Sequence, residues 1–507
     1  MELKVKSLKL VAGRPVAIVH TQTAKKLSLY VNERVKIVKI TKKPKAKKVK
    51  LLTAVVDIAK GILKEDEVAV SAEIIEELKL HEGDKVEVYT APKPLSTNYI
   101  LEKLNGKELN YKKLYAIAAD IVNNSLTEAE IAYFISGVYI YGMTLRETAF
   151  LTRAMVETGN KLGLKDVEVV DKHSIGGTAG NRTTPIIVSI CAAAGLVMPK
   201  TSSRAITSAA GTADVIECLA KVEFSIAAIR KIIKKTNACL VWGGALGLAP
   251  ADDKIIQVER ILSLDPEAQL IASILAKKLA VNAFYVLLDI PYGEGAKVTH
   301  AEALKLAKKF SQLAKNFSLK LKVILTDGSQ PIGNGIGPVL EARDVIAVLS
   351  RQEKRPLDLE KKSVKLSALL FELTGKAKEG EGLALAKQLL DSGVAYKKFK
   401  EIIKAQGGSL ENLSKENLDR KLALAKYKIE IKAKKQGKIS AIDSRAISAI
   451  ARAAGCPADK SAGLYLHKHV NAVVKKHETL LTIYAQTHEK LSYAKKICDN
   501  LQPITIK

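Results

Sequence analysis

The side chains best suited to chemistry in this sequence lie in one glycine- and hydroxyl-rich stretch. From Asp171 to Pro185 it reads Asp-Lys-His-Ser-Ile-Gly-Gly-Thr-Ala-Gly-Asn-Arg-Thr-Thr-Pro, after a predicted strand that ends at Asp171 and before an apolar helix predicted to begin at Pro185. Glycines let backbone N–H groups approach an anion, and a helix N-terminus presents partial positive charge. Lys172 adds a cation, and Ser174 and Thr184 add hydroxyl donors. The stretch predicts a phosphate-binding loop, although it lacks the G-x-x-x-x-G-K-[ST] pattern of the common P-loop; tight turns are the alternative explanation of its glycines.

A second stretch places small and hydroxylated residues around one arginine. From Ser202 to Glu217 it reads Ser-Ser-Arg-Ala-Ile-Thr-Ser-Ala-Ala-Gly-Thr-Ala-Asp-Val-Ile-Glu. Small side chains leave room for a ligand, and Arg204 with its neighbouring hydroxyls can donate hydrogen bonds to an oxyanion. The alternative is structural, since runs of serine and alanine also permit close packing of helices.

This second stretch resembles the thymidine/pyrimidine-nucleoside phosphorylase family. It meets every position of the family pattern S-[GS]-R-[GA]-hydrophobic-x-x-[TA]-[GA]-G-T-x-D-x-hydrophobic-E, and Lys172-His173-Ser174-x-Gly176-Gly177 matches the family's phosphate loop. Within the family the chain is more similar to the archaeal AMP phosphorylases, which carry an extra N-terminal domain. It shares with them the loop form from Gly180 to Pro185 and the Trp-Gly-Gly-Ala-Leu run from Trp242.

The resemblance implies phosphorolysis of an N-glycosidic bond, in which phosphate attacks C1′ of a ribose while the base leaves. The implied reaction converts AMP and phosphate into adenine and ribose 1,5-bisphosphate, with CMP and UMP as further substrates. The residues implied to hold phosphate are Lys172, Ser174, Thr184, Ser202 and Thr212. Those implied to contact the substrate are Gly177, Ser203, Arg204, Ala205, Ile206, Thr207, Ser208, Thr212, Ser273, Lys277 and Lys297. His173 is expected near the reaction centre, either to orient phosphate or to transfer a proton.

The leaving base must be protonated, which requires a general acid. The archaeal enzymes place an aspartate where this chain has Asp265, in the run Ser-Leu-Asp-Pro. From the sequence alone, an N-cap for a helix starting at Pro266 is the favoured explanation of this aspartate, because Asp-Pro-Glu is a common helix start. The family match reverses that preference.

Three further residues are expected to bind the nucleotide. Ser273 and Lys277 are four residues apart in a predicted helix and therefore share one face. Lys297 matches the nucleotide-binding lysine of the AMP phosphorylases, and a cation suits a 5′-phosphate that a nucleoside lacks. In so basic a chain, a solvated surface lysine is the alternative reading of Lys297.

One departure from the family limits the base preference that can be predicted. The nucleoside enzymes carry a base-reading arginine ahead of the helix that holds Ser273, whereas Arg260 here is out of register. This departure favours a different base selectivity and argues against a strict thymidine enzyme. A thymidine or pyrimidine-nucleoside phosphorylase, which does not need a 5′-phosphate, is the alternative function. A phosphoribosyltransferase of related architecture is a third reading, and it would normally require diphosphate and magnesium.

Four successive regions must position these residues. Residues 1–92 are rich in predicted strands, and the runs Glu2–Lys6 and Val35–Ile40 alternate polar and apolar side chains at a period of two, so this region predicts a β-rich, barrel-like domain. Residues 93–160 predict a small helical domain, joined by a returning segment near 250–280. Alternating strands and helices in 161–405 predict a large, mainly parallel α/β domain, and 406–507 a smaller C-terminal α/β domain. The fold class is thus multidomain α/β.

Individual elements can be predicted within these regions. Thr127 is predicted to cap a helix that runs through Phe134. The predicted strands are Glu2–Lys6, Val35–Ile40, Lys85–Tyr89, Val167–Asp171 and Tyr285–Ile290. The further predicted helices are Ser225–Lys235, Thr299–Phe317 and Ile442–Ala454.

Composition narrows the remaining possibilities. The 507 residues carry 81 Lys and Arg against 53 Asp and Glu, a formal charge of +28 that favours anionic partners. Nine basic residues and no acid lie from Arg34 to Lys50, either as a solvated face or as a contact for an anion. A basic nucleic-acid-binding protein is the reading from another class, disfavoured by the intact phosphate motif.

The sequence also leads to expectations about location, cofactors and assembly. Five dispersed cysteines without a CxxC pair predict reduced thiols in a cytoplasmic protein. No signal peptide, membrane span or metal-ligand spacing is expected, and no cofactor is implied. From the family, a homo-oligomer of two or more copies is expected.

Overall fold

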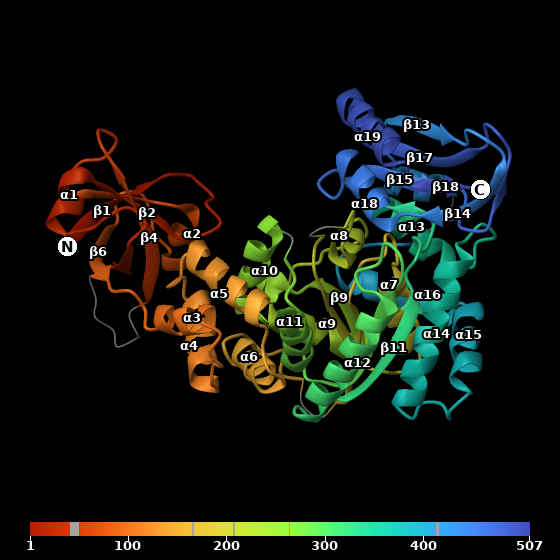
Figure 1. Ribbon diagram of the computed structural model, residues 1–507, viewed down its shortest axis with the longest axis horizontal. Helices are drawn as coiled ribbons and strands as arrows, with labels where there is room; N and C mark the ends of the chain where they lie inside the picture. The colour runs from red at the N-terminus through yellow and green to blue at the C-terminus, as the bar shows by residue number, and fades with distance from the viewer. Residues whose placement is uncertain (41–49, 165–166, 206–207, 263, 412–414) are drawn as a thin grey trace. The chain divides into compact units, whose positions relative to one another are not determined.

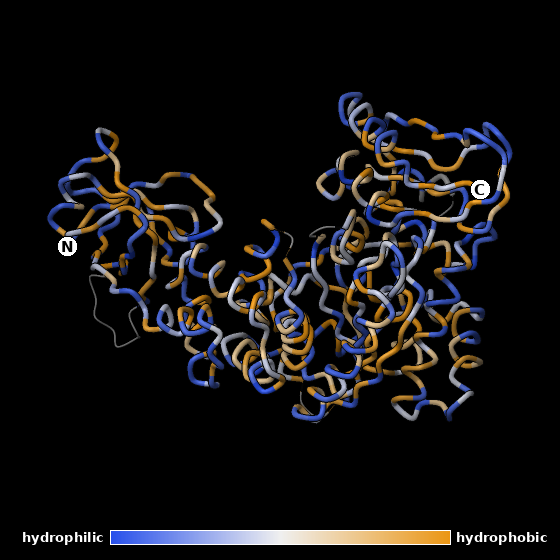
Figure 2. The backbone as a smooth tube through the Cα atoms, viewed as in Figure 1, coloured by the Kyte–Doolittle hydropathy of each residue, from blue (hydrophilic) through white to orange (hydrophobic). Residues whose placement is uncertain are grey.

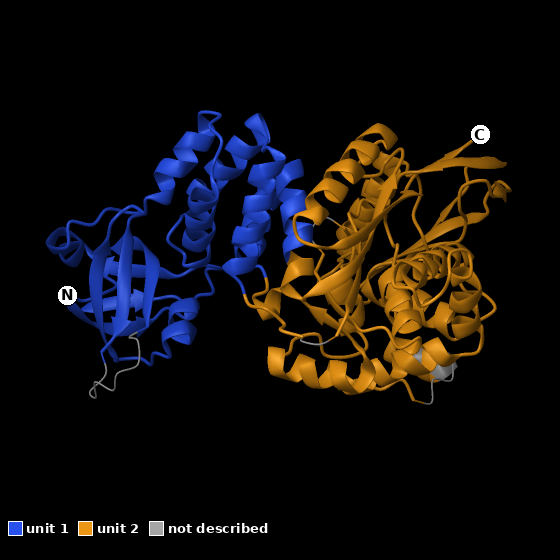
Figure 3. Cartoon of the chain, turned by 90° about the horizontal axis from the view of Figure 1, so that it is seen from below, with its two compact units in different colours: residues 1–159, 249–276 blue, residues 160–248, 277–507 orange. Residues whose placement is uncertain are grey.

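The chain folds into two compact units. The computed structural model describes residues 1–40, 50–164, 167–205, 208–262, 264–411 and 415–507. Residues 1–159 and 249–276 form the first unit, and residues 160–248 and 277–507 form the second (Figure 3).

The first unit begins with a closed β-barrel, which confirms the predicted barrel-like domain. The strand order is β1-β5-β2-β4-β3-β6, so closure gives every strand two neighbours (Figure 1). In β1, Leu3 and Val5 are buried while Glu2 and Lys4 face solvent. Strand β6 repeats this alternation, whereas β2, β4 and β5 are apolar along most of their length, and hydrophobic stretches run through the barrel (Figure 2). The barrel region contains β1 (Glu2–Ser7), β2 (Val16–His20), α1 (Thr21–Lys26), β3 (Arg34–Lys39), β4 (Leu51–Ala59), β5 (Glu67–Val70), α2 (Ala72–Leu78) and β6 (Lys85–Ala91).

The basic run predicted as a solvated face or an anion contact lies largely in residues 41–49, outside the described residues. Three of its described cations have acidic partners. Arg34 forms an ion pair with Glu130, and Lys39 and Lys50 form ion pairs with Asp84 and Glu77 at 2.6 and 2.5 Å.

Helices make up the rest of the first unit. The helix predicted from Thr127 is confirmed: the Thr127 hydroxyl and the Glu130 carboxylate bond each other's backbone N–H groups in a capping box. Between two helices, the Lys103 ammonium donates to the Glu147 carboxylate at 2.9 Å, and both side chains are buried. The helices are α3 (Ser96–Leu104), α4 (Tyr111–Val122), α5 (Glu128–Tyr141), α6 (Leu145–Glu157), α10 (Pro250–Leu262) and the first ten residues of α11 (Glu267–Ala280).

The second unit contains the predicted parallel sheet. Strand β10 pairs in parallel with β7 on one side and β11 on the other, and β8 pairs in parallel with β9. Helices α7, α14 and α16 pack apolar side chains into one large core with these strands. The elements are β7 (Val169–Ser174), α7 (Thr183–Ala193), β8 (Met198–Ser202), α8 (Thr212–Glu217), α9 (Ile226–Thr236), β9 (Ala238–Trp242), the 3-10 turn η1 (Gly244–Leu246), β10 (Ala283–Tyr292), α12 (His300–Lys315), β11 (Lys320–Asp327), α13 (Pro338–Leu349), α14 (Leu357–Leu373), α15 (Gly382–Asp391), α16 (Val394–Ala405) and α17 (Lys415–Lys421).

The C-terminal part of this unit adds two small sheets and two helices, as the predicted C-terminal α/β domain requires. One sheet has the order β12-β15-β17-β13 and takes β12 from the preceding α/β region; the other has the order β16-β14-β18. The helix predicted at Ile442–Ala454 is α18. The elements are β12 (Gly335–Ile336), β13 (Tyr427–Lys432), β14 (Gly437–Ile442), α18 (Ser444–Ala453), β15 (Gly463–Leu466), β16 (Val473–Val474), β17 (Thr479–Ala485), α19 (His488–Leu501) and β18 (Ile504–Ile506).

Candidate functional site

Strand β7 contains residues that the sequence placed in the loop after it, from Lys172 to Ser174. The predicted end of the strand at Asp171 is wrong: β7 starts at Val169 and continues through Ser174. The reason is tertiary, because β10 pairs with β7 up to the register Asp289 opposite Ser174. Lys172 and Ser174 therefore lie on a strand and share one face of the sheet, and Asp171 and His173 share the other.

The glycine loop between β7 and α7 is built on conformations that favour glycine. Gly176 and Gly177 have φ of 87° and 92°. A Cβ on Gly177 would lie 2.6 Å from the backbone nitrogen of Lys297, whereas one on Gly176 would have no atom within 4 Å. The structure thus brings Gly177 and Lys297, two residues predicted to contact substrate, against each other. The Lys297 side chain is exposed.

Helix α7 begins at Thr183, so the predicted start at Pro185 is also wrong by two residues. Pro185 occupies the third helical position, where its missing N–H has no intrahelical partner to lose. Thr184, predicted to hold phosphate, is buried in the same first turn. The helix N-terminus thus lies at the end of the glycine loop, an arrangement that suits an anion.

Lys172 is the centre of this group. Its side chain is only 2% exposed, and its ammonium donates to the Thr183 hydroxyl at 3.0 Å. Burial, assisted by nearby cations and opposed by Asp289, lowers the pKa of Lys172 to about 7. The hydroxyls of Ser174 and Thr178 are buried and have no hydrogen-bond partner among the described residues. Buried hydroxyls are normally paired, so these two are available to a ligand.

On the opposite face of β7, Asp171 is buried between two lysines. It pairs with Lys200 of β8 at 2.9 Å and with Lys278 of α11. Burial alone would raise the pKa of Asp171, but the two lysines outweigh it and hold the pKa below its usual range. Burial and the same lysines hold the pKa of His173 well below its usual range. His173 is therefore a neutral imidazole at physiological pH and can orient a ligand by hydrogen bonding.

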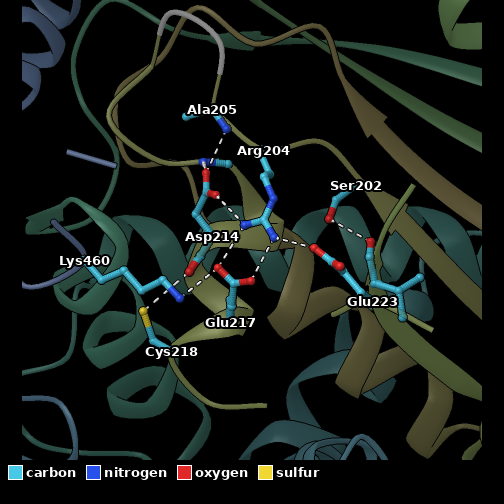
Figure 4. Close-up of polar contacts among 10 residues, drawn as sticks. Ser202, Arg204, Ala205, Asp214, Glu217, Cys218, Glu223 and Lys460 are labelled. Carbon is cyan, nitrogen blue, oxygen red and sulfur yellow. Dashed lines mark hydrogen bonds and ion pairs between the residues drawn. The ribbon is translucent and has the colours of Figure 1, made fainter. Parts of the chain in front are cut away.

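In the second predicted stretch, Asp214 of α8 holds together two residues of the loop before this helix, Ala205 and Gly211 (Figure 4). One Asp214 carboxylate oxygen accepts from the N–H groups of Ala205 and Gly211 at 2.7 and 2.8 Å. A Cβ on Gly211 would lie 2.4 Å from the Ser203 carbonyl oxygen, so position 211 has space only for glycine. Ile206 and Thr207, predicted to contact substrate, lie outside the described residues.

The guanidinium of Arg204 is surrounded by carboxylates. It donates twice to Glu217 at 2.8 Å and once to Glu223 at 2.9 Å (Figure 4). The guanidinium also lies 4.8 Å from the Trp242 ring centroid. Glu217 also pairs with Lys460 at 2.8 Å. Because the cation is neutralised where it stands, its geometry suits holding the loop in place more than binding an oxyanion.

Arg182 joins the two stretches, and sequence reasoning gave it no role. Its guanidinium donates to the Thr212 hydroxyl at 2.8 Å, to the Ala210 carbonyl at 2.9 Å and to the buried Glu341 carboxylate at 2.6 Å. It thereby fixes Thr212, a predicted phosphate ligand, next to the start of α7. The available signal was a lone arginine directly before an apolar, buried helix, where a cation needs an acidic partner.

The hydroxyls of the other predicted serines have intramolecular partners or face solvent. Ser202, the last residue of β8, donates to the Val241 carbonyl at 3.2 Å, and Ser208 donates to the Ala210 carbonyl at 3.1 Å. Ser203 is exposed.

The remaining predicted residues lie on or near α11, which belongs to both units. Asp265 is exposed and lies two residues before the helix starts at Glu267. Ser273 donates to an Asp252 carboxylate oxygen at 2.9 Å, within the first unit. Lys277, one turn further along, is half-buried and belongs to the second unit.

The described residues hold neither a metal-binding cluster nor a helix able to cross a membrane. No group of three or more His, Cys, Asp or Glu side chains among them is placed to hold a metal ion. Within the same residues, no helix combines the length and apolar character needed to cross a membrane.

Comparison with known proteins places the chain in a family. Three family models match: the helical bundle domain of a glycosyl transferase family at residues 97–159, its a/b domain at 166–396, and the pyrimidine nucleoside phosphorylase C-terminal domain at 438–505. Anthranilate phosphoribosyltransferase from Thermus thermophilus shares the fold, with a TM-score of 0.51 and 18% identity over 61% of this chain and 99% of that one.

Relatives match almost the whole chain. An AMP phosphorylase from Thermococcus kodakarensis is 42% identical over 100% of this chain and 98% of its own length. An AMP phosphorylase from Pyrococcus furiosus is 43% identical over 88% of each chain. A Legionella pneumophila protein named "Putative thymidine phosphorylase" is 43% identical over 89% of this chain and 85% of its own. The chain therefore belongs to the glycosyl transferase family that contains the AMP phosphorylases and the thymidine phosphorylases, and it is an enzyme of that family.

Proposed function

We propose that the protein catalyses phosphorolysis of AMP, forming adenine and ribose 1,5-bisphosphate from AMP and inorganic phosphate. The observation that carries this proposal is the match along the whole chain to relatives named AMP phosphorylase. The buried hydroxyl of Ser174 beside Lys172, and the contact of Gly177 with Lys297, support it from the structure.

In the proposed reaction, a phosphate oxygen bonds to C1′ as the bond from C1′ to the base nitrogen breaks. Asp265 gives its proton to the leaving base, so the products are neutral adenine and a second phosphoester on the sugar. Phosphate is held by Lys172, Ser174, Thr184, Ser202 and Thr212, the last of which is fixed by Arg182. Positioning phosphate against C1′ supplies much of the rate.

His173 is proposed to orient phosphate rather than to transfer a proton. Its pKa lies well below the usual range, so at neutral pH the ring carries no proton that it can readily give up as an acid. One ring N–H remains as a hydrogen-bond donor toward a phosphate oxygen.

The nucleotide is proposed to contact Gly177, the loop from Ser203 to Ser208, Thr212, Ser273, Lys277 and Lys297. Lys297 would bind the 5′-phosphate, which distinguishes a nucleotide from a nucleoside. CMP and UMP are proposed as further substrates, and two or more copies of the chain are proposed to assemble. A cytoplasmic location fits these substrates.

The test is phosphate-dependent release of base from AMP, adenosine and thymidine, measured side by side. We expect release from AMP, with ribose 1,5-bisphosphate formed. Lys297→Ala should lower kcat/KM for AMP about a hundredfold, as expected when one charge-assisted phosphate contact is lost. Any activity on adenosine should change little. Lys308→Ala, an exposed lysine on the neighbouring helix α12, is the matched control and should leave both substrates unaffected.

A thymidine or pyrimidine-nucleoside phosphorylase is the second candidate function. The relatives named for thymidine phosphorylase activity, at 43% identity, favour it. Release of base from thymidine but not from AMP would establish this function and remove the proposed role of Lys297.

A further inference from the structure

A second buried ion pair lies on the same face of the sheet as Lys172. Strand β10 places Asp289 directly opposite Ser174, and Leu287 opposite Lys172. Alternation along the strands puts Lys172, Ser174 and Asp289 on one face. Lys362, from α14, reaches this face and stands 3.1 Å from Asp289. None of the sequence motifs includes Asp289 or Lys362.

The pair is held from several sides and is closed to solvent. The Asp289 side chain is fully buried and that of Lys362 is 10% exposed. One Asp289 oxygen accepts from the Thr326 hydroxyl at 2.5 Å, and the backbone carbonyl accepts from the Ile175 N–H at 3.2 Å. The second Asp289 oxygen and the Lys362 nitrogen have no hydrogen-bond partner among the described residues. The pair therefore adjoins the first residue of the glycine loop and retains hydrogen-bonding capacity.

The charges around Lys172 do not balance. On the face of Lys172 lie Asp289 from β10 and Lys362 from α14, and Asp327 at the end of β11 also acts on Lys362. Across the strand, Asp171 pairs with Lys200 of β8 and Lys278 of α11, beside the neutral His173. The cation Arg182 before α7 is matched by Glu341. With all four lysines charged, the three aspartates leave one positive charge uncompensated. An anion such as phosphate supplies the negative charge that this group lacks.

Asp289 and Lys362 act on Lys172 in opposite senses. The carboxylate favours the charged form of Lys172, and the Lys362 ammonium disfavours it, since like charges repel in a buried site. Burial also holds the pKa of Lys362 itself below its usual range, in spite of Asp289.

We propose that Asp289 and Lys362 are positioning residues of the phosphate site, which together set the charge of Lys172 and couple phosphate binding to uptake of a proton by its amine. A buffer acid or hydronium ion gives up the proton, which forms an N–H bond on the Lys172 nitrogen, and no covalent bond of the phosphate or of the rest of the protein changes. The inference rests on the proposed function only in taking phosphate as the ligand held by Lys172.

The test is calorimetric titration of the full chain with inorganic phosphate between pH 6 and 9, in two buffers of different ionisation enthalpy. The wild-type protein should take up a fraction of a proton per phosphate near pH 8, and its affinity should fall as pH rises above about 7. In Asp289→Asn this fall in phosphate affinity should begin about one pH unit lower than in the wild type, and in Lys362→Met about one unit higher. At a fixed pH in that range, each shift corresponds to about a tenfold change in phosphate affinity.

A general structural defect would not shift the pH dependence of phosphate affinity in opposite directions in Asp289→Asn and Lys362→Met. Lys362→Arg keeps the charge and should restore the wild-type profile, and Lys365→Met, exposed on the same helix, should leave it unchanged. If Asp289→Asn does not fold, the proposal is tested by Lys362→Met alone, in which the fall in phosphate affinity should begin at a higher pH. Shifts in the same direction, or unchanged profiles in variants that bind phosphate, overturn the proposal. Failure to cleave AMP while these shifts appear would overturn the proposed function and leave the pair standing.

Discussion

The contact between Gly177 and Lys297 offers a matched pair of substitutions for testing the nucleotide site. Gly176 and Gly177 are adjacent and have nearly equal φ of 87° and 92°. Alanine at either position therefore has the same left-handed strain of about 1 kcal/mol. Only at Gly177 does the added Cβ meet another segment, 2.6 Å from the Lys297 nitrogen and 2.8 Å from its Cβ.

The difference between the two variants measures that contact. An ordinary contact needs about 3.5 Å, so the backbone at Lys297 must retreat by roughly 0.9 Å in Gly177→Ala. A displacement of that size at a site residue costs about a hundredfold in rate, or about 2.7 kcal/mol. We expect kcat/KM for AMP to fall about a hundredfold in Gly177→Ala and less than about fivefold in Gly176→Ala.

The assay is base release at saturating phosphate, with AMP and adenosine as substrates and thermal unfolding of both variants as the folding control. The loss in Gly177→Ala should be concentrated on AMP, because the displaced lysine is assigned to the 5′-phosphate. Equal losses in the two glycine variants would show that loop strain alone acts, and the placement of Lys297 beside the loop would be refuted as a functional contact.

Two further predictions concern stability. The pKa of Lys172 falls from 10.5 to about 7 on folding, so below about pH 7 its burial costs up to about 5 kcal/mol, and this cost declines as pH rises toward 10.5. Lys172→Met should therefore unfold at higher denaturant than wild type at pH 6.5, converge with it near pH 10, and lose phosphate binding; lower stability at pH 6.5 would contradict this. Glu147→Gln leaves the Lys103 ammonium buried without a countercharge and should cost about 3–5 kcal/mol, seen as a lower melting temperature. Adding Lys103→Met should recover part of that loss, and strictly additive losses would rule out the pair.

Much of the fold could be predicted because the relevant signals are local. The β1 alternation and the Thr127 capping box depend on neighbours within a few residues, and both are found where expected. The end of β7 was misplaced because the Lys-His-Ser run is polar and resembles a loop. Only pairing with β10, more than a hundred residues away, makes it a strand. The division into domains at residues 92, 160 and 405 stays a prediction.

The candidate site also contains residues that could be predicted from the sequence and residues that could not. Its motif residues could be named from the sequence, since Lys172, Ser174 and Thr212 stand in recognisable runs. Their supporting charges could not, because Lys200, Lys278 and Lys362 stand in no recognisable motif and a basic chain offers dozens of lysines. What distinguishes these three is burial against Asp171 and Asp289, which depends on how β8, α11 and α14 pack.

The buried lysines also explain why so much positive charge can be functional here rather than incidental. A lysine in a protein interior is destabilising unless it has a countercharge, and the three aspartates near these four lysines leave them one negative charge short. An arrangement optimised for stability alone would replace the excess lysines with apolar residues. Their presence around a strand end with an unpaired serine hydroxyl is accounted for by an anion that completes the charge balance when it binds. On this reasoning the same imbalance that weakens the empty site gives it affinity for phosphate.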